Sequence, residues 1–505
     1  MNPPDEVSGA QRTHRASGPW SGRWTRDTRA ALPAAGVTAR PYRPEVMTSV
    51  LRGRPGSADE PPSSARRPLR LRGDLAAVVV AALLVTAAAL VGWRLIEAGV
   101  PVLVEWPPLL GAWFPHVGPG TVPAVLVALL VALGGPAVAR TLRWGPLLAL
   151  AYAASLTWTF ALAVIDGWFV GVAERLATPS EYLAELPRTP DVAVFLQTFA
   201  DRIAGRTPDS LVTHAAGHPP AATLFYVLLD RLGFPGGGYA GAVTAAIGAS
   251  AVVAVALTLA ALGGRELART YLPFGVLFPG AVWVGVSADG MFAAILAWGV
   301  ALLALGAVRR GGGGHLLCLL AGVVLGLSLF FSYGLVLAGL LPVAVALVTR
   351  RVAPLLTGGL GAAGVVAAFA AAGFWWYAGY EQVTIRYYEP GEYGLLRPYE
   401  YWVWGNLAAL VLVLGPAVIA GLRRATWRPR TVPTALLALA AAGLAAVLVA
   451  DLSGLSKSEV ERIWLPFAVW IVPLAALLPR PSARWWLLAQ AALALAINHL
   501  LDTVW

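Results

Sequence analysis

A carboxylate and a pair of histidines lie at the two ends of one long polar segment, residues 166–218. Asp166 opens the segment directly after the apolar run Ala161–Ile165. A carboxylate beside hydrocarbon is costly unless it is solvated, paired or functional. Asp166 is therefore a candidate general base, a ligand of an acceptor hydroxyl or a metal ligand. The alternative is an interfacial side chain that is exposed to water.

His214 and His218 close this segment and have the i, i+4 spacing of a helical metal pair. Pro219-Pro220 follow His218, however, and proline disfavours helix in the residue before it. We expect the two prolines in the first turn of the next helix, with His218 at its N-terminus. There the histidines could hold a phosphate or a substrate hydroxyl, or simply cap the helix.

A second acidic break occurs at Ser287-Ala-Asp289-Gly290, between two apolar runs. Asp-Gly is a strong turn signal, so the break is typical of a tight turn. The functional alternative is that Asp289 is a second carboxylate, which faces Asp166.

Two further polar segments carry cations. Residues 374–401 interleave Arg386 and Arg397 with Tyr and Trp side chains. This pattern suits either an interfacial aromatic belt or a site for a sugar and a phosphate.

The other cationic segment, residues 451–462, contains the only lysine of the chain, Lys457, close to Glu459, Glu461 and Arg462. These charges could pair with one another within the loop. Alternatively, Lys457 and Arg462 could bind a lipid phosphate.

The composition places these segments in a membrane protein. Of the 505 residues, 58% are hydrophobic and 13% are charged, and the mean hydropathy is +0.69. Soluble domains carry about 25% charged residues, and apolar runs of roughly the ~20 residues that span a bilayer recur along this chain. The single cysteine, Cys318, excludes an intrachain disulfide. No Walker loop or Rossmann glycine fingerprint indicates a nucleotide-fuelled enzyme.

Arginine clusters set the expected orientation, because loops rich in Arg stay on the cytoplasmic side. Placing the clusters inside predicts an all-α bundle of about thirteen transmembrane helices, in a multi-pass protein of the plasma membrane with a cytoplasmic N-terminus. The expected helices lie near residues 75–97, 121–139, 146–165, 239–262, 271–287, 291–308, 315–331, 333–349, 353–373, 402–421, 433–450, 463–479 and 485–503. Residues 219–233 are too short to span, so we expect a partial or tilted helix there, or a fourteenth crossing.

This orientation gathers the polar segments on the outer face. They are residues 98–120, 166–218, 287–290, 374–401 and 451–462. Residues 1–73 are rich in Pro, Ser, Gly and Arg without apolar periodicity, and they indicate a disordered basic cytoplasmic tail. Such a tail beside a membrane helix sets topology or touches anionic lipid, and we expect no nucleic-acid partner. The transmembrane domain then covers residues 74–505.

In three places the chain resembles the GT-C superfamily of polytopic membrane glycosyltransferases, which includes protein O-mannosyltransferases and aminoarabinose transferases. Asp166 ends a helix before a long outer loop, His218-Pro219-Pro220 open the next apolar segment, and residues 271–308 form two helices that are interrupted at Ser287-Ala-Asp289. The resemblance covers about residues 146–308, with a looser echo at Glu461-Arg462. Gly167 stands where a second acid often follows the first, so Glu174 or Glu181 would have to replace that acid.

The resemblance implies an inverting glycosyltransferase that moves a hexosyl or pentosyl group from a polyprenyl-phosphate donor to an acceptor hydroxyl. Asp166 would be the catalytic base and Asp289 an auxiliary acid. Basic side chains would bind the donor phosphate, and His214 and His218 would orient the acceptor or the phosphate. The substrate-binding residues implied in this way are His214, His218, Arg386, Arg397, Lys457, Glu461 and Arg462.

The implied partners are the polyprenyl-phosphate donor, a lipid, glycan or protein acceptor, and membrane lipids. No cofactor is certain, and a divalent metal stays open because some members of the superfamily hold one. Two other functions remain as alternatives. One is a lipid or polysaccharide transporter or flippase, and the other is a non-catalytic subunit of an envelope complex. A transporter would need charged residues near the bilayer midplane and interrupted helices in matching halves of the chain. The sequence shows few midplane charges and no convincing internal repeat, which favours the enzyme over the transporter.

Overall fold

The structure is a computed structural model that describes residues 71–205 and 207–504. The basic tail predicted over residues 1–73 lies outside the described residues, except that its last three residues begin the first helix, α1. Nearly all described elements are helices, and the two strands are only three residues each. The prediction of an all-α transmembrane bundle is confirmed.

Within the described residues, eight helices are long and apolar enough to cross a membrane. They are Leu71–Glu97 (α1), Thr121–Thr141 (α2), Trp144–Asp166 (α3, Trp144–Ala163, with a 3-10 turn), Gly237–Gly263 (α7, Gly237–Ala249, with α8, Ala251–Gly263), Ala288–Val308 (α11), Ala353–Ala371 (α14), Tyr399–Trp427 (α17) and Thr434–Leu452 (α18). A ninth candidate is the pair Leu465–Leu477 and Arg480–Leu500, which is bent by 112°.

The other elements are shorter. They are β1 (Gly111–Trp113), α4 (Val192–Thr198), α5 (Thr213–Gly217), α6 (Pro220–Arg231), α9 (Arg265–Val276), α10 (Ala281–Val284), α12 (Gly312–Ser328), α13 (Leu340–Thr349), α15 (Trp376–Tyr387), α16 (Tyr393–Leu396), α19 (Val460–Ile463), α20 (Leu465–Ala468), α21 (Ala483–Leu500) and β2 (Leu501–Thr503). Strands β1 and β2 pair in antiparallel register. Helix α6 is the partial helix expected at residues 219–233.

Among the described residues, fewer helices than the thirteen expected are individually long and apolar enough to span, because proline and glycine divide several apolar runs. The run expected at 271–287 forms α9 and α10, which are separated around Pro279-Gly280. The run expected at 463–479 forms α20 and a 3-10 helix at Val472–Leu477. At about 1.5 Å per residue, the twelve residues of α9 extend only ~18 Å. Hydropathy alone does not report these breaks.

Helix α17 bends instead of ending, and one side chain compensates for the bend. Gly415 has φ 75° inside the helix, just before Pro416. Gln490 of α21 accepts a hydrogen bond from the amide of Ala417 and donates one to the carbonyl of Leu414. Backbone groups that a kink frees within apolar surroundings need such partners.

Helix α11 is the centre of the bundle. In its most apolar window 72% of the residues are buried, against 11% in α1. It packs against α7, α8, α12 and α13. Helix α12, which packs on α11, also packs closely against α14. Glycines allow this contact, because a Cβ atom at Gly322 would lie 1.8 Å from the carbonyl oxygen of Gly358. Small residues allow this close approach without a polar side chain.

The arginine clusters meet at one end of the bundle. Arg269 donates to the carbonyls of Ala139 and Leu142 at the end of α2. Arg351 donates in the same way to the carbonyl of Ala307 at the end of α11. These contacts satisfy carbonyls that a helix end leaves open. The segments predicted to share one membrane face therefore contact one another.

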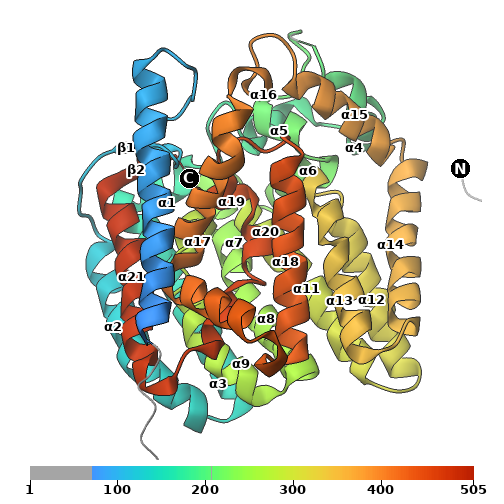
Figure 1. Cartoon of the computed structure of the whole chain (residues 1–505). Coiled ribbons are helices and arrows are strands. Elements are labelled where there is room, and N and C mark those ends of the chain that lie inside the picture. The colour runs from blue at the N-terminus through green and yellow to red at the C-terminus, as the bar shows by residue number, and fades with distance from the viewer. Residues whose placement is uncertain (1–70, 206, 505) are drawn as a thin grey trace, which may run out of the picture. The chain divides into compact units, whose positions relative to one another are not determined.

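The opposite end carries the polar segments. Helices α4, α5, α15 and α16 lie together there, whereas α9 lies toward the arginine-rich end (Figure 1). This grouping agrees with the loops predicted to share one face. Which end faces the cytoplasm stays a prediction from the arginine pattern.

Candidate active site

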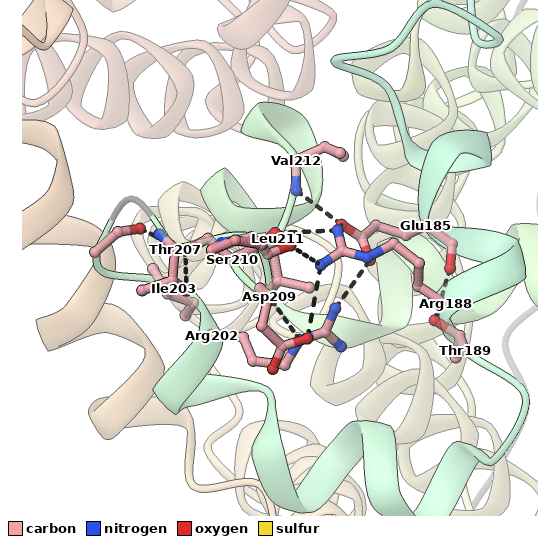
Figure 2. Close-up of polar contacts among 12 residues, drawn as sticks. Glu185, Arg188, Thr189, Arg202, Ile203, Thr207, Asp209, Ser210, Leu211 and Val212 are labelled. Carbon is pink, nitrogen blue, oxygen red and sulfur yellow. Dashed lines mark hydrogen bonds and ion pairs between the residues drawn. The ribbon is translucent and has the colours of Figure 1, made fainter.

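The second half of the segment 166–218 is folded around a buried carboxylate. Glu185 is fully buried and accepts hydrogen bonds from Arg188 at 2.7 Å, Arg202 at 3.2 Å and the amide of Val212 at 2.8 Å (Figure 2). Charge-assisted bonds of this kind are stronger than neutral ones. The segment is therefore a structured cap over the helices.

Arg386 attaches this cap to the next polar segment. Its Nη1 donates to the carbonyls of Ile203 and Leu211, at 2.9 and 3.0 Å. This contact joins α15 to the segment 166–218. The predicted role of Arg386 in donor binding is not tested by these contacts, which are structural.

A buried arginine lies between two carboxylates beneath the cap. Nη1 of Arg462 is 2.6 Å from Oδ2 of Asp289, and its Nη2 is 2.5 Å from Oε2 of Glu459. The Arg462 and Asp289 side chains are only 6% and 4% exposed. Although burial opposes it, the charges of Asp289 and Glu459 raise the pKa of Arg462. Arg462 is therefore a fixed cation in the interior.

Asp289 reaches this arginine because of how α11 begins. Ser287 is the N-cap of α11, and its Oγ accepts from the amide of Gly290 while donating to the carbonyl of Trp283. Asp289 thus occupies the first turn of the central helix, where a negative charge is favourable. The expected tight turn is a capped helix start, and its carboxylate is buried.

Glu459 is held from the other side by a second arginine. Nη2 of Arg397 lies 3.2 Å from Oε1 of Glu459, and its Nη1 donates to the carbonyl of Lys457. Burial opposes the ionisation of Glu459, but Arg462 and Arg397 lower its pKa to about 2. Glu459 therefore stays ionised at neutral pH.

The backbone at this point is strained. Ser458 and Glu459 have φ of 71° and 60°, a region that residues with a Cβ rarely adopt. Each such residue costs about 1–3 kcal/mol, and such residues cluster at functional sites. This backbone conformation accompanies the position of the Glu459 carboxylate between Arg397 and Arg462. The segment 451–462 is therefore a candidate part of a functional site.

Lys457 is a cation whose ammonium group already donates hydrogen bonds to backbone carbonyls. Its Nζ donates to the carbonyls of Gly394 and Arg397, at 2.7 and 3.1 Å, and lies 6.0 Å from the rings of Tyr388 and Tyr399. Burial lowers the pKa of Lys457. These contacts join the two cationic segments, so Lys457 helps to position Arg397.

Glu181 is a buried acid beside this charge cluster. It is 2% exposed, and its Oε1 lies 3.7 Å from Nε2 of His214. Burial raises the pKa of Glu181 to about 8, although the charge of Arg462 opposes that shift. Its Oε2 has no hydrogen-bond partner among the described residues. A carboxyl group that titrates near neutral pH is suited to proton transfer.

Both predicted histidines lie at this cluster and are neutral. Burial, followed by the charge of Arg462, lowers the pKa of His214 to about 3. Burial also lowers the pKa of His218. Nδ1 of His218 lies 3.1 Å from the carbonyl oxygen of Phe331. Because a carbonyl only accepts, Nδ1 carries the proton, and Nε2 of the neutral ring is an acceptor.

The local backbone around His218 agrees with the sequence. His218 is extended, Pro219 is the N-cap of α6 and Pro220 is its first residue. The ring of Tyr182 packs 5.9 Å from that of His218 and 6.3 Å from that of His214. Aromatic packing therefore fixes both imidazoles.

Glu461 is buried next to the cluster but binds the backbone. Its Oε1 accepts from the amide of Leu110 at 3.0 Å, and its Oε2 has no hydrogen-bond partner among the described residues. Burial raises the pKa of Glu461 to about 7. Glu461 thus attaches the segment 98–120 to α19.

Asp166 lies in a different polar cluster. It ends the α3 span, as predicted, and is 18% exposed. Its Oδ2 accepts from Nη2 of Arg175 at 3.0 Å, and its Oδ1 lies 2.7 Å from Nε2 of His116. Nε2 of His116 has no hydrogen-bond partner among the described residues despite this short distance. Among the described residues, the ion pairs of Asp166 lead to His116 and Arg175, and that of Asp289 leads to Arg462.

No metal-binding cluster of protein side chains is found among the described residues. Residues 71–205 and 207–504 contain no group of three or more His, Cys, Asp or Glu that could hold a metal ion. In the buried cluster the carboxylates of Asp289 and Glu459 face the guanidinium of Arg462. The two histidines do not form a helical i, i+4 pair, because His218 follows α5 in extended conformation.

The structure brings together most of the predicted side chains. His214, His218, Asp289, Arg397, Lys457 and Arg462 belong to one connected set, with Glu461 at its edge. Arg386 and Asp166 lie elsewhere. Sequence reasoning missed Glu459 as a site residue and considered Glu181 only as a replacement acid. The signal available for Glu459 was its place between Lys457 and Arg462 in a chain almost without lysine.

Two solved structures of the aminoarabinose transferase ArnT from Cupriavidus metallidurans are similar to this chain. One is in the apo state, at 17% identity, and the other is bound to undecaprenyl phosphate, at 16% identity; the TM-score is 0.41 for both. Each match covers 66% of this chain and spans 59% or 60% of the ArnT chain. No protein-family model and no curated protein matches the chain. At this identity and TM-score the similarity assigns no role to any residue.

Proposed function

We propose that this chain is an inverting membrane glycosyltransferase that moves a hexosyl or pentosyl group from a polyprenyl-phosphate donor to an acceptor hydroxyl on the outer membrane face. The observation that carries the proposal is the buried Arg462, between two carboxylates and beside Glu181 and two neutral histidines. It lies where three polar segments meet the central helix. A buried charge network with acids of raised pKa is typical of an active site.

The charges of the cluster suit an anionic donor. Arg462, Arg397 and Lys457 contribute three positive charges, and Asp289 and Glu459 contribute two negative ones, while Glu181 and the histidines are neutral near pH 7. The sum of these charges is one positive charge, and Glu461 at the edge of the cluster, with a pKa of about 7, adds up to one negative charge as it ionises. Planar guanidinium groups bind phosphate oxygens with defined geometry, so Arg462 is the proposed ligand of the leaving phosphate.

Glu181 is the proposed general base. In its ionised form it takes the proton of the acceptor hydroxyl while that oxygen attacks the anomeric carbon of the donor. The bond from the anomeric carbon to the phosphate oxygen breaks, and the phosphate leaves with its electron pair toward Arg462. A single displacement inverts the configuration at that carbon. Nε2 of His218, an acceptor, would bind a hydroxyl of the acceptor or of the sugar.

This proposal moves the base from Asp166, which the sequence favoured, to Glu181. The carboxylate of Asp166 is paired with Arg175 and His116, in a separate cluster. Asp166 remains a candidate for acceptor binding at the outer end of α3, since 18% of its side chain is exposed. The acceptor would be a lipid, a glycan or a protein, and the donor would enter from the membrane plane.

A strain that lacks the gene tests the proposal through comparative lipid and glycan analysis. The deletion should remove at least one glycosylated product, and the wild-type gene should restore it. Glu181→Gln and Arg462→Lys should fail to restore it, because one loses the base and the other loses the planar guanidinium. Glu174→Gln is the matched control, since Glu174 is an exposed acid of the same cap. An unchanged profile in the deletion strain would contradict an enzyme of this class.

Asp166→Asn distinguishes the two assignments of the base. If Glu181 is the base, Asp166→Asn retains part of the product, whereas Glu181→Gln abolishes it. The reverse order would return the role to Asp166. Each variant should first be shown to reach the membrane at the wild-type level.

A further inference from the structure

A cavity opens at the arginine-rich end of the bundle, between α2, α9 and the start of α21. It has about 430 Å³ of atom-free space, counting the part that is open to the surroundings. Its lining residues are Pro136, Arg140, Arg269, Thr270, Pro273, Phe274, Leu478, Arg480 and Ala483. None of them belongs to the candidate active site.

The cavity is apolar inside and cationic at its rim. Pro273, Phe274 and Leu478 are buried, whereas Arg140 and Arg480 are exposed. Arg140 is one residue from the end of the 21-residue α2 span, and a helix of that length is just long enough to cross the ~30 Å hydrocarbon core, so its ends are expected near the lipid headgroups. A surface that combines a cationic rim with an apolar interior at this depth matches the two parts of a phospholipid.

The rim has donors left for a ligand. Within the described part of the chain, the Arg140 side chain makes no hydrogen bond and no ion pair. Arg269 uses its Nη1 on the carbonyls of Ala139 and Leu142, which leaves the Nε and Nη2 groups of its five-donor fork. Arg480 pairs with Glu266, and both side chains are mostly exposed, at 63% and 65%. Such an exposed pair contributes little, so a ligand can compete for Arg480.

The charge here is unbalanced. Arg140, Arg269 and Arg480 face the cavity with three positive charges, and Glu266 supplies one negative charge beside them. Arg265 adds a further cation near Arg269, since both guanidinium groups lie 5.7 Å from the Trp144 ring centroid. Basic pockets between transmembrane helices bind anionic lipid headgroups.

We propose that this cavity, formed by the cationic rim Arg140, Arg269 and Arg480 over the apolar interior at Pro273, Phe274 and Leu478, binds the phosphate headgroup of an anionic phospholipid from the adjacent leaflet. The phosphate oxygens accept hydrogen bonds from the arginines, and the upper part of an acyl chain contacts the apolar residues. The bound lipid bridges α2, α9 and α21, which also pack against one another directly.

Native mass spectrometry of the purified full-length protein in detergent tests this site. Dioleoylphosphatidylglycerol is titrated against dioleoylphosphatidylcholine, which has the same chains without net charge, and against inorganic phosphate. We expect saturable binding of phosphatidylglycerol, with at least tenfold weaker binding of the other two probes. Arg140→Gln and Arg480→Gln should each weaken phosphatidylglycerol binding about fivefold. The matched control is Arg310→Gln, an exposed arginine outside the cavity.

Two further variants separate charge from shape. Arg140→Lys keeps the charge and should retain binding within about twofold. Ala483→Phe fills the cavity while leaving the rim arginines in place, and it should weaken binding as strongly as the loss of one arginine. Circular dichroism and size-exclusion chromatography show whether each variant is folded.

Three outcomes would overturn the proposal. One is equal affinity for phosphatidylglycerol and phosphatidylcholine. Another is equal binding of phosphatidylglycerol by the Arg140→Gln/Arg480→Gln double variant and by Arg310→Gln. The third is binding of inorganic phosphate as tight as that of the lipid, which would make the rim a site for free anions. None of these results bears on the glycosyltransferase activity, so the two proposals fail independently.

Discussion

The ion pair between Arg462 and Asp289 gives the sharpest test of the candidate site, because stability and activity should respond to it differently. In the Arg462→Met variant, Asp289 loses its cationic partner while its side chain stays 4% exposed. Leaving one charge of a buried pair uncompensated costs about 3–5 kcal/mol. We therefore expect the free energy of unfolding to fall by about that amount.

The double variant Asp289→Asn/Arg462→Met should recover most of this loss. It removes both charges of the pair, and Glu459 retains Arg397 as a partner at 3.2 Å. Replacing a buried pair by neutral groups is often close to neutral in free energy. With the Asp289→Asn single variant measured as well, a double variant destabilised by only about 1 kcal/mol would give a coupling free energy of at least about 2–4 kcal/mol between the two positions, the minimum applying if Asp289→Asn alone is neutral.

Unfolding by SDS in mixed micelles, followed by tryptophan fluorescence, measures these free energies. The 20 tryptophans of the chain include the buried Trp464 and Trp470, which flank α20. Product formation is measured in parallel in the complemented deletion strain. The double variant should be folded but inactive, since the proposed phosphate ligand is absent.

Additive effects of the two substitutions, with a coupling below about 0.5 kcal/mol, would refute the reasoning about the buried pair. Product formation by a stable double variant would refute the functional part. It would show that Arg462 is there for packing and that the phosphate is bound elsewhere.

Three other predictions concern the acid, the cap and the kink. Glu181 accepts a proton only when it is ionised, and its pKa is about 8. The kcat/KM of the wild type should therefore rise about tenfold per pH unit up to roughly pH 8 and then level off. The Glu181→Gln substitution should lower kcat/KM by a factor of about 10²–10⁴. Glu185→Gln should speed amide hydrogen exchange over residues 185–212 by ~10–100-fold, because the charged acceptor of Arg188, Arg202 and Val212 is lost. Gln490→Leu should lower the free energy of unfolding by about 1–3 kcal/mol, since it leaves the buried Leu414 carbonyl and Ala417 amide without partners.

The pH prediction has a matched control, and each of the three predictions has an outcome that would contradict it. Glu174→Gln should keep the wild-type pH profile, and a profile that is flat from pH 6 to 9 would remove Glu181 as the base. His214 does not interfere, since its pKa of about 3 leaves it neutral across that range. Unchanged exchange in Glu185→Gln, or wild-type stability in Gln490→Leu, would show that water or a local shift replaces the lost hydrogen bonds.

The sequence by itself determined where several long apolar helices lie and where polar segments interrupt them. Burial of an apolar run in a bilayer is a property of that run alone, so hydropathy located α1, α11 and α18 without knowledge of their neighbours. The entry of α6 at Pro219-Pro220 was likewise readable, because proline restricts its own backbone and that of the residue before it. Chain-local chemistry was sufficient in these cases.

Tertiary structure alone decided which charges meet. Asp289 and Arg462 are 173 positions apart, and their contact depends on the rotation of α11 and on the backbone at Ser458 and Glu459. Asp166 and Glu181 are both acids of the same segment, yet one pairs with Arg175 in a partly exposed cluster and the other is buried beside Arg462. Burial and the distance to an opposite charge set the protonation of an acid, and both are properties of the packed molecule. That is why the sequence could offer both acids as candidates, while only the folded chain shows that Glu181, and not Asp166, lies in the buried cluster.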